Sequence, residues 1–108
     1  MNYSDQYKKT YQSLPENLAA HYPELNFDNH CYLRIALDNT FEARWDTALA
    51  RPAYKNLSQG QLSKVRELLN RYFENKDLLL EHNRNSLRWR KKQWISDFVT
   101  SLLGLFDV

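Results

Sequence analysis

Glycine is almost absent from this sequence, and its scarcity limits the folds that the chain can adopt. Two glycines occur among 108 residues. Valine, isoleucine and threonine are sparse, whereas leucine, lysine, arginine, glutamate, glutamine and alanine are common. This usage favours helices over strands at nearly every position. We therefore expect an all-α fold, a compact bundle of about four to six helices with short linkers.

Size and charge narrow the class of protein further. A chain of 108 residues that is 43% hydrophobic and 14% aromatic should fold as a single helical domain over residues 1–108. A net charge of +2 predicts no strong attraction of the whole molecule to nucleic acid or membrane. One cysteine excludes an intrachain disulfide, and neither a signal core nor a membrane-length apolar run occurs, so we expect a cytoplasmic protein.

Capping patterns and apolar periodicity predict the main helices and their ends. Three tyrosines spaced four apart indicate a short first helix: Tyr3, Tyr7 and Tyr11. The main predicted helices span residues 14–22, 30–50, 58–74 and 77–103. Their expected caps are a Ser13/Glu16 box, Asp28 or Asn29, a Ser58/Gln61 box, and Asp77. The last helix either runs unbroken or breaks near Asn85, and the sequence leaves both possibilities open.

The predicted helix over 30–50 places two arginines among its apolar residues. Its apolar face is expected to hold Leu33, Leu37, Phe41, Trp45 and Ala48. Arg34 can pair with Asp38 one turn later, but Arg44 has no obvious partner. Either the arginines extend into solvent along the aromatic side chains, or they form an anion pocket roofed by Trp45. The residues that would bind the anion in such a pocket are Arg34, Arg44 or Arg88, together with Trp45 and Asn39.

Residue types used in metal and catalytic sites occur, but their spacing gives little support for an enzyme. His30 and Cys31 are adjacent, so their side chains diverge on a helix. The row Asp38, Glu42 and Asp46 is expected to be a solvated helix edge rather than a metal site. No phosphate loop or catalytic triad spacing is present. We expect no cofactor and no metal.

A basic segment rich in tryptophan lies near the C-terminus. Its cations are Arg84, Arg88, Arg90, Lys91 and Lys92, which surround Trp89 and Trp94. Helical projection predicts a core face that consists of Leu80, Leu87, Trp94, Phe98, Leu102 and Leu105. Trp89 then points outward, unless a break near Asn85 buries it. Because the apolar face has a natural use as core, a membrane-surface role is the weaker interpretation.

Two segments of the chain together resemble a known family. "CYLRIALDNTFEARWDTALARPAY" and the downstream "NSLRWR" look like a family of small, poorly characterised bacterial helical proteins with acetyltransferase-type labels. The resemblance covers roughly residues 29–90 and implies an accessory domain of such an enzyme rather than the enzyme itself. It also implies that one group of residues lies together in space: Arg34, Asp38, Asn39, Trp45, Arg88, Trp89 and Arg90.

These observations predict a non-enzymatic interaction or accessory module with an Arg/Trp surface near residues 84–94. A protein is the expected partner, an oligomer is possible, and no membrane contact is expected. The alternatives are binding to a nucleic-acid phosphate backbone and a small-anion pocket.

Overall fold

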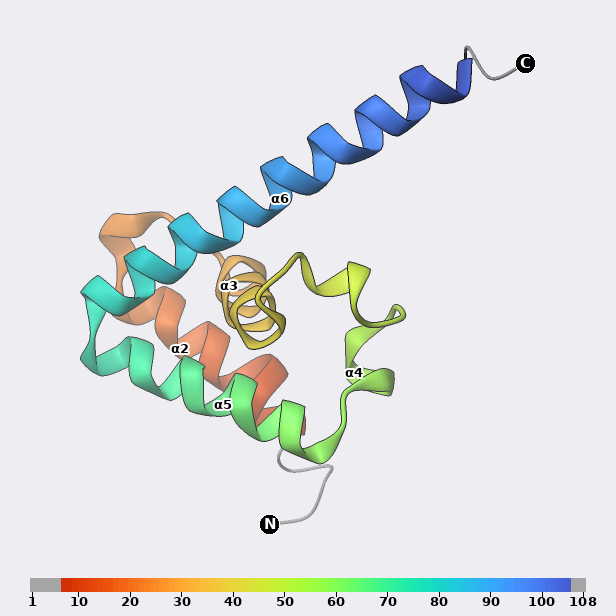
Figure 1. Cartoon of the computed structure of the whole chain (residues 1–108). Coiled ribbons are helices and arrows are strands. Elements are labelled where there is room, and N and C mark those ends of the chain that lie inside the picture. Colours follow the sequence, from red (N-terminus) through yellow and green to blue (C-terminus); the bar gives the residue numbers. More distant parts are fainter. Residues whose placement is uncertain (1–6, 106–108) are drawn as a thin grey trace.

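The computed structural model describes residues 7–105, apart from the side chains at positions 100, 101 and 103–105, and its described part consists of helices joined by short loops (Figure 1). The α-helices are α2 (Leu14–His21), α3 (Asn29–Phe41), α4 (Ala53–Asn56), α5 (Gln59–Glu74) and α6 (Lys76–Leu105). Shorter segments are the π-helical η1 (Lys9–Ser13) and the 3-10 turns η2 (Pro23–Leu25) and η3 (Trp45–Thr47). No strand occurs within residues 7–105, and the all-α prediction is confirmed.

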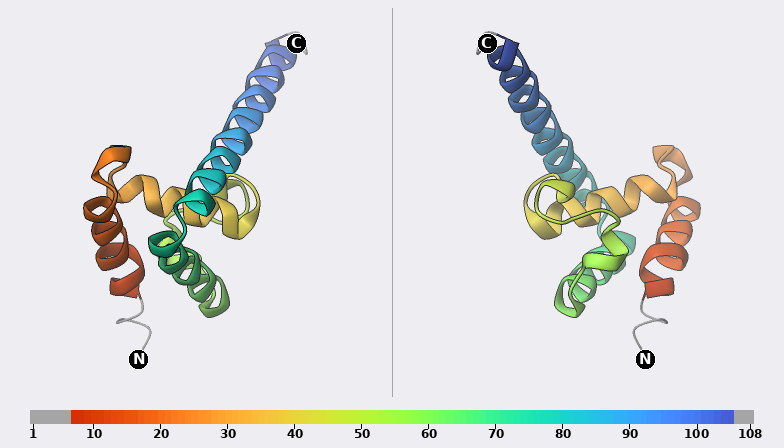
Figure 2. Two further views of the ribbon diagram at one scale, coloured as in Figure 1. Left: turned by 90° about the vertical axis from the view of Figure 1, so that its left-hand side faces the viewer. Right: turned by 90° about the vertical axis from the view of Figure 1, so that its right-hand side faces the viewer.

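Helix α3 lies at the centre of the bundle and packs against α2, α5 and α6 (Figures 1 and 2). Its buried side chains Tyr32 and Ile35 belong to the same core as Leu18 of α2, Leu69 of α5 and Leu79 of α6. All five are completely shielded from solvent. Burial of such side chains stabilises the fold by roughly 1.5–3 kcal/mol each. The core therefore joins α2, α5 and α6 to α3.

Helix α5 forms as the sequence predicts. The Ser58 hydroxyl accepts a hydrogen bond from the Gln61 backbone N–H at 3.1 Å, and the Gln61 side chain accepts one from the Ser58 N–H at 2.9 Å. This reciprocal capping box satisfies two N–H groups that a helix start leaves open. The helix ends at Glu74, as expected.

Helix α3 starts where predicted but ends nine residues before the expected end at residue 50. Asp28 caps the start by accepting a hydrogen bond from the Cys31 N–H at 2.9 Å. Glu42 then adopts a left-handed conformation with φ of 52°, and the Ala43 N–H donates to the Asp38 carbonyl at 3.2 Å. This closure ends the helix. The predicted 30–50 helix is therefore wrong in its second half, and Arg44, Trp45 and Ala48 do not lie on α3.

The N-terminal segment and α2 were expected to be two separate helices, but they form one continuous helical segment. Tyr7 and Tyr11 stack with ring centroids 5.0 Å apart, as the spacing predicts, whereas Tyr3 lies outside the described residues. The Ser13/Glu16 capping box does not form. Ser13 has helical backbone angles because η1 continues directly into α2, so its side chain makes no cap hydrogen bond.

Helix α6 is continuous from Lys76 to Leu105, so no break forms near Asn85. Asn75, not Asp77, caps its start, since the Leu78 N–H donates to the Asn75 side-chain oxygen at 2.9 Å. The second half of the helix extends away from the other helices (Figure 2). The radius of gyration is 15.7 Å, against about 13 Å for a compact chain of 100 residues.

Candidate functional site

A buried carboxylate joins α3 to α6. Asp38 is completely shielded from solvent and accepts hydrogen bonds from Arg90 Nε at 2.7 Å and from the Ser86 hydroxyl at 2.6 Å. The Trp45 backbone N–H donates to its other oxygen at 3.0 Å. A buried charge is tolerated when it is paired and hydrogen-bonded in this way. Asp38 therefore holds three segments together: α3, η3 and α6.

Arg34 does not pair with Asp38, contrary to the prediction from the sequence. Its guanidinium donates to the Ser86 hydroxyl and to the Asn83 side-chain oxygen, both at 2.9 Å. The Ser86 hydroxyl thus accepts from Arg34 and donates to Asp38. Arg90 from α6 occupies the place at the carboxylate that we expected Arg34 to take.

A second set of hydrogen bonds continues this contact along α3. The Asn39 side-chain amide donates to the His82 carbonyl at 2.9 Å and accepts from Asn85 at 3.4 Å. Arg88 donates to Asn85 at 2.9 Å, and Trp89 lines the same shallow depression as Asn39 and Arg88. The residues that the family resemblance groups together are therefore close in space.

Asn83 and Ser86 belong to this network although the sequence did not single them out as site residues. Their side chains lie on the same side of α6 as Leu79 and Arg90, because the intervals of four, three and four residues follow the helical repeat. This helical spacing could have placed Asn83 and Ser86 on the face of α6 that packs on α3. Asparagine and serine also favour helix breaks and caps, however, so these residues indicated a possible break instead.

Arg44, which had no predicted partner, directly precedes η3 and pairs with Asp46 inside it. The Arg44 Nε lies 2.7 Å from one oxygen of Asp46, and Arg51 lies 2.5 Å from the other. Burial on its own raises the pKa of Asp46, but the hydrogen bond from Arg51 and the positive charges of Arg44 and Arg51 lower it below its usual value. Arg44 is thus the partner of a neighbouring acid, and it is not among the residues that line the depression with Asn39 and Arg88.

The exposed tryptophan on α6 is not the one that the sequence predicts. Trp94 exposes 63% of its surface, whereas Trp89 is half-buried. Leu87, Phe98 and Leu102, which we expected in the core with Trp94, are also exposed. The core-face prediction is wrong here because α6 turns a mixed side toward α3, with Leu79, Asn83, Ser86 and Arg90.

A continuous exposed row remains on α6, and we call it the outer stripe. Its residues, at intervals of three or one along the helix, are Arg84, Leu87, Arg88, Lys91, Trp94, Ile95, Phe98, Val99 and Leu102. The first part is basic and the second part is apolar. Trp94 and Phe98 stack within the stripe, with ring centroids 5.6 Å apart.

The residue types that suggested metal or thiol chemistry do not form a site. The expected row of three acids is broken: Asp38 is buried against Arg90, Glu42 ends α3, and Asp46 pairs with two arginines. Within residues 7–105 no group of three metal-binding side chains comes together. Cys31 is half-buried behind the Asp28 cap.

Comparisons with family models, curated proteins and solved structures found no match for this chain. The family resemblance stays a prediction. Among the described helices, none is long and apolar enough to cross a membrane.

Proposed function

We propose that this chain is a non-enzymatic interaction module that binds a protein partner through the outer stripe of α6. The observation that carries the proposal is the exposure of five large apolar side chains on a helix that extends beyond the other helices (Figure 2). These side chains are Trp94, Ile95, Phe98, Val99 and Leu102, and each exposes at least 40% of its surface.

Such a surface is uncommon on a protein that acts alone. Soluble monomers rarely expose large contiguous apolar patches, and those that do occur often mark binding sites. Aromatic side chains such as Trp94 and Phe98 contribute much of the binding energy at protein interfaces. The remainder of the helix is already fixed, since Arg90 and Ser86 attach it to Asp38. The apolar part of the stripe therefore follows directly on a part of α6 that is anchored to α3.

The charges of the outer stripe define the chemistry of the partner. Arg84, Arg88 and Lys91 are exposed, and within the described part of the chain none of them lies in an ion pair. They precede the apolar residues on the same side of the helix. A complementary surface would be an apolar groove about 12 Å long, the rise of eight helical residues, with acidic side chains at one end.

Other occupants fit the outer stripe less well. It contains no acidic residue, so a second copy of the chain could cover the apolar part but would not neutralise the cations. A helix lying on a flat membrane would hold the basic and the apolar ends of the stripe at the same depth, although the cations favour the headgroups and the apolar side chains favour the acyl chains. The expectation that the stripe's apolar residues serve as core no longer argues against membrane contact, because they are exposed. Lipid is therefore a competing occupant that an experiment has to distinguish from protein.

The nucleic-acid alternative loses part of its support. Arg90 is bound to Asp38, and Trp89 is half-buried, so the predicted Arg/Trp cluster offers fewer groups for phosphate contacts and base stacking. The bacterial and cytoplasmic assignments, and a role beside an acetyltransferase, stay part of this proposal. The lone half-buried cysteine suits a reducing compartment.

Site-specific photocrosslinking in cells that natively make the protein tests this proposal. A photoreactive amino acid replaces Ile95 in the outer stripe or, as a control, Ser63 on the exposed side of α5. We expect one discrete protein adduct from position 95 and none from position 63. The partner peptide in the adduct should contain apolar residues next to aspartate or glutamate.

Charge reversal provides the matched comparison. Lys91→Glu should abolish the adduct, whereas Lys64→Glu on α5 should leave it unchanged, because only Lys91 belongs to the outer stripe. An adduct that contains only a second copy, a lipid or nuclease-sensitive material would overturn the proposal. So would a protein adduct that persists in the Lys91→Glu variant.

A further inference from the structure

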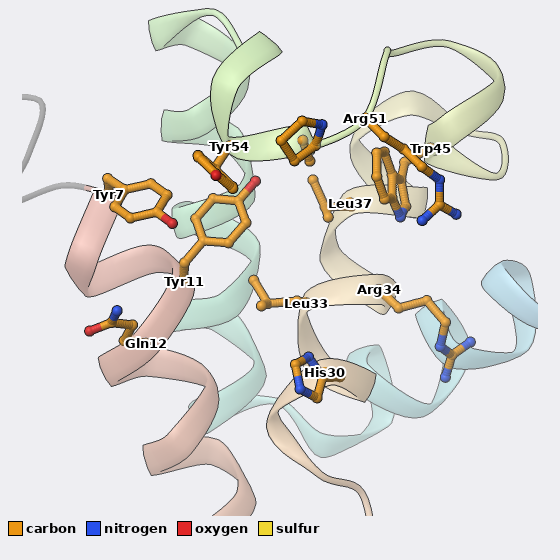
Figure 3. Close-up of a pocket in the computed structure, with 12 residues that line it drawn as sticks. Tyr7, Tyr11, Gln12, His30, Leu33, Arg34, Leu37, Trp45, Arg51 and Tyr54 are labelled. Carbon is orange, nitrogen blue, oxygen red and sulfur yellow. The ribbon is translucent and has the colours of Figure 1, made fainter.

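Two cavities of about 480 Å³ each border α3, and they differ in the charges that face them. The first lies between the N-terminal segment, α3 and the loop before α4, and its walls are largely aromatic and aliphatic (Figure 3). Two arginines stand beside it. Arg34 donates to Asn83 and Ser86 of α6, and Arg51 is bound to Asp46. Neither guanidinium therefore gives this cavity a charge that would select a ligand.

The second cavity is the shallow depression between the end of α3 and the facing sides of α5 and α6. Three cations line it: Lys64 and Arg71 of α5, and Arg88 of α6. Glu42 is the one acid among its described lining residues. Three positive charges and one negative charge leave +2 around the depression, as much as the formal charge of the whole chain. Such a concentration of positive charge attracts anions.

Two observations place the positive charges at the depression itself. The Arg88 guanidinium donates to the side-chain oxygen of Asn85 at 2.9 Å, and Asn85 lines the depression. The His82 ring lines it as well. Burial lowers the pKa of His82, and although a neighbouring acid opposes this effect, the positive charges of Arg71 and Lys64 lower the pKa further. The two cations of α5 therefore lie close enough to this ring to act on it.

The acids nearby do not neutralise these cations. Within residues 7–105, neither Arg71 nor Arg88 forms an ion pair, and the same holds for Glu42. Lys64 lies 4.0 Å from Glu67, and both side chains are about half exposed, so this pair is weak. All three cations thus remain available to an anion from solution.

His82 adds an uncharged donor to the depression. The Tyr72 hydroxyl lies 2.8 Å from its Nδ1, and burial raises the pKa of Tyr72, so this hydroxyl keeps its proton and donates it to the ring. A neutral imidazole that accepts at Nδ1 carries its own proton on Nε2. Among the hydrogen bonds of the described residues, none uses this Nε2. It can therefore donate to a bound anion.

We infer that the depression binds a small phosphate anion through Lys64, Arg71 and Arg88. A phosphate group carries nearly two negative charges at neutral pH, which matches the excess of +2, whereas a carboxylate carries one. Its oxygens point in several directions, so it can accept from cations on two helices at once. The depression shares Arg88 with the outer stripe but takes its other cations from α5, so phosphate binding does not depend on the proposed partner.

Titration of the full chain with inorganic phosphate, at constant pH and ionic strength, tests this inference by nuclear magnetic resonance. The chain has three histidines, so the ring protons of His82 report on the depression, and those of His21 and His30 serve as internal controls. We expect a saturable shift at His82 and little change at the other two. Acetate should bind about fivefold or more weakly, because it carries one charge.

A second titration distinguishes two sources of the phosphate group. Glycerol 3-phosphate replaces inorganic phosphate under the same conditions. Binding that is equal or tighter indicates a phosphate monoester as the ligand, and much weaker binding indicates the free ion.

Three variants with exposed positions identify the site. Arg71→Gln and Arg88→Gln should each weaken phosphate binding about fivefold or more. Arg84→Gln removes the same charge from α6 at a position that does not line the depression, so it should weaken binding less than about twofold.

Three results would overturn the inference. The first is the absence of a saturable His82 shift at phosphate concentrations of about 10 mM. The second is equal binding of phosphate and acetate. The third is equal weakening by all three variants, which would show a diffuse attraction to the charge of the chain rather than a site.

Discussion

At the scale of single residues, two carboxylates organise the polar contacts of this protein. Asp38 is bound by Arg90 and, through Ser86, connected to Arg34, while Asp46 lies between Arg44 and Arg51. The sequence showed that the two arginines near α3 need partners. It could not show that Asp38 would pair with Arg90, because these residues are 52 positions apart and meet only when α6 packs on α3.

Replacement of Asp38 should be among the most damaging polar substitutions. Asp38→Asn should lower the free energy of unfolding by about 3 kcal/mol or more, since Arg90 loses its buried counter-charge. Asp46→Asn should cost about 1 kcal/mol or less, because its partners are more exposed. Urea denaturation of both variants measures the difference. Equal losses would contradict the central role given to Asp38.

His82 should make the stability depend on pH. Burial lowers its pKa below the usual value, and this outweighs the opposing effect of Glu81, while Arg71 and Lys64 lower it further. The Tyr72 hydroxyl lies 2.8 Å from its Nδ1, which suits a neutral imidazole that accepts this hydrogen bond. As the pH falls through about 6.5, the unfolded chain takes up a proton at His82 before the folded chain does, so stability falls.

Thermal unfolding at pH 7.5 and pH 5.5 measures this effect. The melting temperature of the wild type should decrease more between these values than that of His82→Gln, whose amide can still accept from Tyr72. Identical decreases in the two proteins would show that His82 does not contribute.

At the scale of helices, two of the predicted caps form, whereas the Ser13/Glu16 box and the Asp77 cap do not. The Ser58/Gln61 box and Asp28 both cap the helices expected of them, because each cap lies within three residues of the N–H group that it satisfies. The end of α3 was missed because Glu42, rather than a glycine, adopts the left-handed conformation there. Without a glycine at that position the sequence contains no ordinary stop signal.

The α5 cap is a direct test of this local stabilisation. Ser58→Ala should lower the free energy of unfolding by about 1 kcal/mol, whereas Ser58→Asp should retain most of it, since a carboxylate also accepts from the Gln61 N–H. Ser63→Ala, an exposed substitution inside the same helix, should be neutral or slightly stabilising. Denaturant titration of the three variants would contradict this account if Ser58→Ala were as stable as the wild type.

At the scale of the whole molecule, composition was enough to predict the fold class but not the surface. Helical periodicity identified one apolar row on α6, which includes Trp94 and Phe98. It could not reveal that the second half of α6 extends beyond the helices that might have covered this row (Figure 2). Because Asn83, Ser86 and Arg90 bind α6 to α3, the outer stripe is left free.

The most direct test of the central claim measures how accessible Trp94 is in the purified chain. A variant with Trp45→Phe and Trp89→Phe retains Trp94 as its one tryptophan, and acrylamide quenching of its fluorescence reports the exposure of the outer stripe. We predict quenching close to that of a free tryptophan derivative and independent of protein concentration. Strong protection of Trp94 would contradict the account, because the stripe would then be covered by the chain itself or by a second copy.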